Sequence, residues 1–301
     1  MKLKFLRNSC VAALFAASAM AIAGPVILGG DDLTDHGSRS AGVNQEGWLY
    51  IEKAVSNVLS GTTRAGTITT DIVALGSAAN PTFNSGDAGG AIGSAANVLG
   101  KTVTFFDSAS AIDNFFSDLL NGLINPRMIW LAGTGAFNDL DSFEGARLTA
   151  NAAAINSFVS SGGGLMAHGS GSVAYGWLSA LLPSINEVSG CNSNGATLTA
   201  AGQAAFPGLS NNDVNASAGP CHSNFTGDFG GLQTLAFDGD QRSYIIGGGA
   251  STIIQCGKPG QPPCPPNDVP EPGSLPLLVV AGLAAAFARR LRNQSRRTKE
   301  R

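Results

Sequence analysis

The feature that most constrains this fold is a repeated alternation of short apolar runs with longer helical segments. Five apolar runs of strand length lie at residues 25–30, 72–76, 102–106, 128–132 and 165–167. Between them lie segments of helical spacing or helix-forming composition, at residues 48–58, 91–99, 112–120 and 142–160. Strands that alternate with helices four times predict an α/β fold, with an open, mainly parallel sheet and helices on both faces. The runs 232–237 and 243–246 flank a turn and predict a C-terminal β-hairpin.

Within these elements, the apolar positions predict which side chains form the core. Trp48, Trp130 and Trp177 each lie in an apolar element, so we expect them in the core and not at a surface where sugars stack. In the helix predicted over 142–160, the residues expected on the inner side are Phe143, Leu148, Ile155, Phe158 and Val159. Ser108 is placed to cap the helix that follows it.

The N-terminus has the three parts of a secretory signal peptide. Lys2, Lys4 and Arg7 precede an apolar stretch at residues 11–19, and Ala21-Ile22-Ala23 is a small-x-small cleavage site. These features predict a signal peptide over residues 1–23, an α/β domain over 24–257, a proline-rich linker over 258–268 and a separate C-terminal segment over 269–301.

The C-terminal segment combines a proline motif, a short apolar run and a basic tail. Pro270-Glu271-Pro272 precedes residues 275–288, which are apolar but shorter than the about 20 residues of a stable membrane span. Arg289, Arg290 and Arg292 follow. This order resembles the PEP-CTERM sorting signal of Gram-negative bacteria. The alternative is an ordinary C-terminal membrane anchor.

The resemblance to PEP-CTERM proteins implies partners and a location. Exosortase, a membrane-embedded transpeptidase, would process the chain near the motif after the secretion machinery has exported it. The apolar run would lodge transiently in the inner membrane, and the product would reach the cell surface or the extracellular matrix. Proteins with this signal accompany exopolysaccharide and biofilm production, so exopolysaccharide is an expected partner.

The net charge and the cysteines of the mature body indicate what it can bind and how it is cross-linked. Residues 24–268 carry eight Lys and Arg against 19 Asp and Glu, which gives a net charge near −11 and excludes a basic nucleic-acid footprint. After removal of the signal peptide, four cysteines remain in an oxidising compartment, so we expect disulfides. Their order suggests the local bridges Cys191–Cys221 and Cys256–Cys264, although four cysteines allow three pairings.

Polar residues gather where the predicted strands end. Ligands bind outside the carboxyl ends of the strands in open α/β sheets. The candidate catalytic residues at these ends are Asp31, Asp32, His36, His168 and Ser170. Ser170 would be a hydrolase nucleophile only if His36 or His222 supplied the base and an aspartate oriented it. Short turns favour Asp and Ser for backbone reasons alone, which is the competing interpretation.

Residues 128–172 carry a second resemblance. A strand, a loop and a helix lead to Gly162-Gly163-Gly164-Leu165 and then to His168. This arrangement resembles the class I glutamine-amidotransferase-like superfamily, which has a flavodoxin-like sheet. The family's nucleophilic cysteine is absent here, so glutamine hydrolysis is not implied. The histidine in the turn resembles the trehalose-utilisation (ThuA-like) branch.

The sequence identifies no cofactor. Calcium is the one ion that the acidic body suggests, with Asp139, Asp141 and Glu144 as loop ligands, although the twelve-residue calcium-loop pattern is missing. These acids also suit a helix N-terminus. We therefore expect an exported binding or structural protein of the envelope or matrix. The alternative is a secreted hydrolase or carbohydrate-active enzyme that uses the Asp and His residues at the strand ends.

Overall fold

Five parallel strands form one half of the sheet. The computed structural model describes residues 24–83, 86–134, 138–216 and 219–248. The strands are β1 (Val26–Gly29), β4 (Thr70–Leu75), β5 (Val103–Phe106), β6 (Pro126–Leu131) and β7 (Gly164–Ala167), in the order β5-β4-β6-β7-β1. β4, β6 and β7 are buried almost throughout, as expected for parallel strands covered on both faces.

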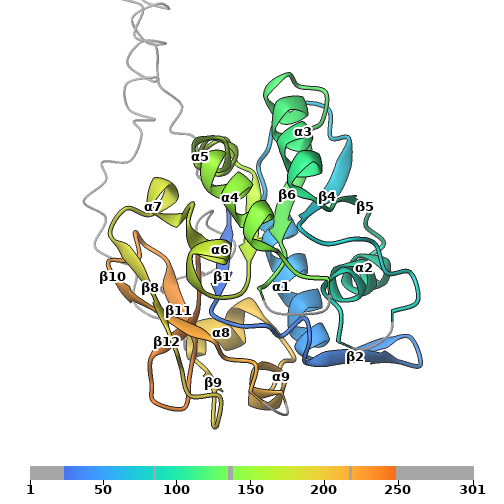
Figure 1. Cartoon of the computed structure of the whole chain (residues 1–301). Helices are drawn as coiled ribbons and strands as arrows, with labels where there is room; N and C mark the ends of the chain where they lie inside the picture. The colour runs from blue at the N-terminus through green and yellow to red at the C-terminus, as the bar shows by residue number, and fades with distance from the viewer. Residues whose placement is uncertain (1–23, 84–85, 135–137, 217–218, 249–301) are drawn as a thin grey trace, which may run out of the picture. The chain divides into compact units, whose positions relative to one another are not determined.

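Antiparallel strands extend the sheet beyond β1. β12 (Ser243–Gly248) pairs with β1, and β10 (Ser223–Gly227) and β8 (Ile185–Ser189) follow. β11 (Gln233–Phe237) forms a hairpin with β12 and also pairs with β9 (Thr197–Leu198). Figure 1 shows this half of the sheet on the side of the domain away from β4 and β5. The α/β class, the mainly parallel sheet and the C-terminal hairpin are confirmed.

Helices cover both faces of the parallel half. α1 (Gly47–Gly61) packs against α2 (Ala88–Leu99), whereas α3 (Ala109–Leu120) packs against α4 (Ser142–Ala150). α2 carries the chain outward from β4 to β5 and α3 carries it back to β6, so right-handed crossovers place these helices on opposite faces. The remaining helices are α5 (Ala152–Ser160), α6 (Gly171–Tyr175), α7 (Leu178–Leu181), α8 (Ala200–Ala205) and α9 (Asn211–Asn215) (Figure 1).

The core contains all three tryptophans. Trp48, Trp130 and Trp177 are fully buried, as predicted. Ser108 caps α3, and its hydroxyl accepts from the backbone N–H of Ala111. The apolar positions expected on the inner side of residues 142–160 are buried except one.

That exception is Phe143, which is 73% exposed, so its predicted core position is wrong. Glu144 and Leu148 occupy the inner face of α4, and Phe143 is one position earlier, rotated about 100° away from them. The predicted single helix is also interrupted at Asn151. The Asn151 side-chain amide donates to the carbonyl of Arg147, a local bond that competes with helix continuation.

A small hairpin of β2 (Gly37–Ser40) and β3 (Val43–Glu46) follows the loop after β1 and was not predicted. The Cys191–Cys221 disulfide is present, and the excursion that it closes contains β9, α8 and α9. The signal peptide, Cys256, Cys264, the linker and the sorting signal lie outside the described residues. No helix in the described part is both long and apolar enough to cross a membrane.

Candidate functional site

A buried aspartate–histidine pair joins the carboxyl ends of two neighbouring strands. Asp31 follows β1, His168 follows β7, and both side chains are fully buried. The Asp31 carboxylate oxygen Oδ1 lies 2.8 Å from His168 Nδ1 and accepts a second bond from the backbone N–H of Leu33. Because a carboxylate faces Nδ1, the proton of the neutral ring belongs there, which leaves Nε2 as the basic nitrogen.

Aromatic rings enclose the His168 imidazole. The ring of Tyr50 meets it edge-on, with the centroids 6.2 Å apart, and the ring of Trp130 lies 5.8 Å away. Burial, and then the charge of Asp31, raise the pKa of the Tyr50 hydroxyl. Neither His168 Nε2 nor Asp31 Oδ2 has a hydrogen-bond partner among the described residues. Buried polar atoms are rarely left unsatisfied, so both are positions where a water or a ligand atom would bind.

The next residue, Asp32, holds the other two histidines. His222 Nε2 lies 2.7 Å from Asp32 Oδ2, and His36 Nε2 lies 3.3 Å from Asp32 Oδ1. This cluster is more accessible than the first pair: the side chains are 12% exposed for Asp32, 20% for His36 and 42% for His222. Two adjacent aspartates therefore contact all three histidines of the chain.

The electrostatics separate the pKa values of these groups. Burial would raise the pKa of Asp32, but the hydrogen bonds to His222 and His36 outweigh it and leave that pKa below its usual value. The hydrogen bond to Asp32 raises the pKa of His222. Burial and the nearby charge of Asp32 raise the pKa of Asp35 to about 6. Groups with opposed shifts in one cluster are suited to separate acid and base roles.

Backbone contacts hold the cluster together. The Asp32 N–H donates to the carbonyl of Pro220, and the His222 N–H donates to the carbonyl of Gly30. A β-bridge joins Asp31 to Cys221, and the disulfide ties Cys221 to Cys191. The disulfide thus fixes the residue immediately before His222 beside the end of β1.

Ser170 is not part of a serine–histidine pair. Its N–H donates to Thr134 Oγ1, and within the described residues its hydroxyl makes no hydrogen bond. Gly169 provides the turn between His168 and Ser170 with φ of 102°, and a Cβ there would lie 2.8 Å from the Thr134 nitrogen. A side chain at Gly169 would therefore both strain the backbone and clash. The structure brings together Asp31, Asp32, His36 and His168 but leaves Ser170 at the edge of this group.

The candidate calcium ligands have structural partners. Asp141 and Glu144 form a capping box at the start of α4, and Glu144 also accepts from the Ser108 N–H. Asp139 lies close to His168. A methyl group placed on Gly133 would be 3.7 Å from Asp139 Oδ1 and also 3.7 Å from His168 Cβ. In the described part of the chain, one group has three potential metal-ligand atoms close together, and it consists of Cys191, Cys221 and Asp238. Its two cysteines are bonded to each other in the disulfide.

The contact of His222 with Asp32 was not predicted from the sequence, in which His222 was a candidate only as a base for Ser170. The signal available was its position directly after Cys221, a residue expected in a disulfide. Comparisons with models of known families, with curated proteins and with solved structures found no match to this chain.

Proposed function

We propose that the α/β domain is a secreted hydrolase that works by acid–base catalysis at the Asp32, Asp35 and His222 cluster. The observation that carries this proposal is the convergence of all three histidines on Asp31 and Asp32 at the carboxyl end of β1. Ordinary turn chemistry accounts for single Asp or Ser residues at strand ends. It does not account for two successive aspartates whose carboxylates both bind histidines from distant parts of the chain.

The cluster supplies both proton transfers of a hydrolysis. The Asp35 carboxylate accepts a proton from water as the water oxygen bonds to the carbonyl carbon of an ester or amide. The His222 imidazolium donates its proton to the leaving oxygen or nitrogen as the old bond breaks. Asp32 holds His222 in place and favours its protonated form. Solvent then takes the proton from Asp35 and restores the proton of His222.

The Asp31–His168 pair acts as a positioning unit beneath this cluster. It fixes the end of β1 against the end of β7, and the N–H of the next residue, Asp32, donates to the carbonyl of Pro220. Its buried Nε2 offers one further acceptor toward the interior.

The ends of the chain support the delivery route. We propose export by the signal peptide, processing by exosortase at the Pro270-Glu271-Pro272 motif, and release to the surface or matrix of a Gram-negative bacterium. The substrate would then be a component of that matrix, such as a sugar ester or sugar amide.

The test is turnover of acetylated sugars and N-acetylated sugars by the mature protein recovered from culture. His222→Gln should lower kcat/KM by roughly 100-fold or more, the usual contribution of one acid–base group. Asp113→Asn is the matched control, because Asp113 is an exposed acid on α3 paired only with Arg147 and Asn151 among the described residues. Equal activity of His222→Gln and the wild-type protein would exclude this assignment.

A binding or structural role is the second candidate, and the complete burial of Asp31 and His168 favours it. Under this alternative the paired residues stabilise the sheet edge and no turnover occurs. Saturable binding of matrix glycans by the wild-type protein, with no hydrolysis of any ester or amide offered, would establish this role instead.

A further inference from the structure

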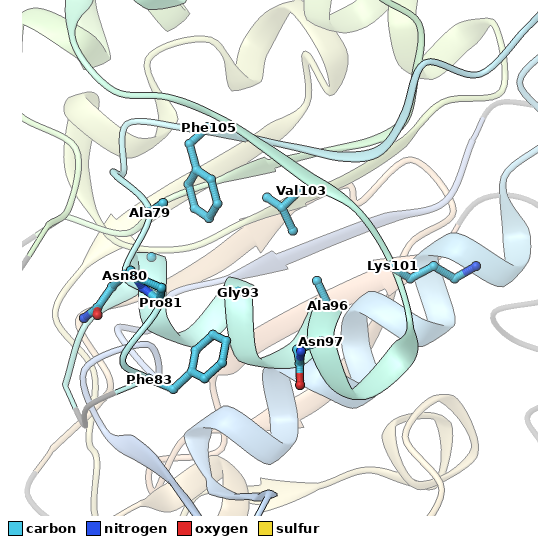
Figure 2. A pocket seen from close by; sticks show the side chains of 11 residues that line it. Ala79, Asn80, Pro81, Phe83, Gly93, Ala96, Asn97, Lys101, Val103 and Phe105 are labelled. Atoms are coloured by element: carbon cyan, nitrogen blue, oxygen red, sulfur yellow. The ribbon is translucent and has the colours of Figure 1, made fainter.

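A separate pocket lies between α2 and the edge strand β5. It is an open hollow of about 260 Å³, lined on its apolar side by Phe83, Val103 and Phe105. Figure 2 shows Phe83 on the loop before α2 and Phe105 on β5, with their rings on either side of the same hollow. The polar lining consists of Asn80, Asn97 and Lys101. This combination of apolar walls with a few polar groups is typical of small-molecule sites.

The hollow exists because α2 presents small side chains to it. Gly89, Gly93 and Ala96 follow one another at helical spacing along the wall of the pocket. A Cβ on Gly93 would lie 3.2 Å from Phe83 Cε1, so even an alanine there would push against the ring. The space is thus preserved by glycine in a helix interior, where glycine costs stability.

The Phe83 ring is held in place before any ligand arrives. The Arg39 guanidinium lies over it, with Cζ 5.0 Å from the ring centroid, and donates to the side-chain oxygen of Asn97. A cation over a ring is attracted to its π-face. Because Arg39 occupies the Asn97 oxygen, the amide group of Asn97 remains as a donor toward solvent or ligand. Fixing these groups beforehand lowers the entropy lost on binding.

The lining chemistry favours one class of ligand. No aspartate or glutamate is among the described residues that line the pocket, although the body has a net charge near −11. Lys101 is the charged lining residue, and its ammonium already faces Asp71 at 3.8 Å. The pocket therefore offers aromatic faces and neutral amide donors. A pyranose ring matches both, because its C–H face packs on an aromatic ring while its hydroxyls bond to amides.

We propose that this pocket binds one neutral sugar unit of a glycan. Arg39 comes three residues after His36 on an extended hairpin strand, so roughly 10 Å of backbone separates the two positions at about 3.3 Å per residue. The next step rests on the proposed function: the substrate of the hydrolase is a glycan chain that binds in this pocket and is cut at the histidine cluster.

The experiment measures binding of neutral oligosaccharides of glucose, mannose and galactose to the mature protein by isothermal titration calorimetry. Phe83→Ala should raise the Kd of the bound oligosaccharide at least tenfold. Phe143→Ala is the matched control, since Phe143 is an exposed aromatic residue on α4, and it should leave the Kd unchanged. Equal affinity of wild-type protein and Phe83→Ala would overturn the proposal, as would a failure of every oligosaccharide to bind.

Two further variants protect the conclusion. Gly93→Ala should keep the fold, since alanine favours helix more than glycine, yet weaken binding by crowding Phe83. The Asp113→Asn variant should bind the oligosaccharide as well as the wild-type protein does, because Asp113 lies outside the pocket and the histidine cluster. Binding that depends on Phe83 without any hydrolysis would support the pocket and refute the hydrolase. Hydrolysis without Phe83-dependent binding would do the reverse.

Discussion

At the scale of single residues, Asp31 carries more than one role. Its carboxylate accepts from His168 and from the Leu33 backbone while fully buried. A buried charge is tolerated only with such partners, and removing one member of a buried pair costs far more than an exposed pair contributes. Asp31 is therefore the position in the cluster where stability and site geometry are most closely linked.

We expect Asp31→Asn to lower the free energy of unfolding by about 3 kcal/mol. His168→Gln should lower it by a similar amount, and the double variant should be less destabilised than the sum because both changes break one interaction. Urea unfolding of the three variants and the wild-type protein gives the coupling energy. Strictly additive changes would show that the two side chains do not depend on each other.

Asp35 and His222 both contribute to the pH dependence of stability. The raised pKa of Asp35, about 6, means that its contribution to stability is present below pH 3.8 and is lost as pH rises through about 6. The raised pKa of His222 means that its contribution is present below pH 6.5 and is lost at higher pH.

Asp35→Asn should therefore gain stability relative to the wild-type protein as pH rises from about 4 to 6. Thermal unfolding across this range measures the difference between the two proteins. In the proposed hydrolase, kcat/KM should rise with pH through about 6 as Asp35 ionises, and fall again above 6.5 as His222 loses its proton. A constant stability difference across the range would contradict the assignment to Asp35.

At the scale of elements, the disulfide excursion supports the site. Cys191 and Cys221 close a loop with a sequence separation of 30 residues, and β10 begins two residues after Cys221. The hydrogen bond of His222 to Asp32 thus depends on where this loop is anchored.

Replacement of both cysteines by serine should lower the free energy of unfolding by about 3.6 kcal/mol, as expected for a loop of this length. It should also lower kcat/KM in the proposed hydrolase, because residue 222 is no longer fixed beside Asp32. Denaturation and kinetics on the Cys191→Ser, Cys221→Ser double variant check both effects. A destabilised variant with unchanged kinetics would separate the loop from the site.

Four of the parallel strands, β1, β4, β6 and β7, were predictable because they are buried on both faces and read as continuous apolar runs. β4 and β6 were found within two residues of their ends. The hairpin strands β2 and β3 were missed because the sequences Gly37-Ser-Arg-Ser and Val43-Asn-Gln-Glu have no apolar alternation. These two strands pair because they are adjacent along the chain and because the Gly47 N–H donates to the carbonyl of His36, which brings the ends of the hairpin together. β8 and β10 likewise depend on long-range pairing.

The site was predictable to the same extent. Parallel strands have their carboxyl ends at one edge of the sheet, and this rule alone predicted that Asp31 and His168 lie in the same region. It did not predict that they contact each other. The pairing of Asp32 with His222 spans 190 residues and runs through an antiparallel strand and a disulfide. Spacing along the chain carries no signal for such a contact.

At the scale of the whole molecule, charge is divided between the ends and the body. Seven of the 18 Lys and Arg follow residue 288 and three precede residue 8, so loss of both ends leaves an acidic protein. Such a charge opposes self-association and binding to anionic surfaces.

The processed chain should begin at Gly24 and lack the C-terminal arginines. Mass spectrometry of protein recovered from cells with exosortase should therefore give a mass well below the 30.5 kDa of the full chain. Cells without exosortase should retain the arginine tail. An identical C-terminus in both strains would identify the segment as an ordinary anchor.

The disulfide beside His222 also has a consequence for timing. Thiols stay reduced inside a bacterial cell, so under the proposed export route the bond that fixes residue 221 would form only after export. A newly made chain would hold Asp31, Asp32 and two histidines near one another while the third remained unanchored. The protein would then be latent in the compartment where it is synthesised and become competent where it is released.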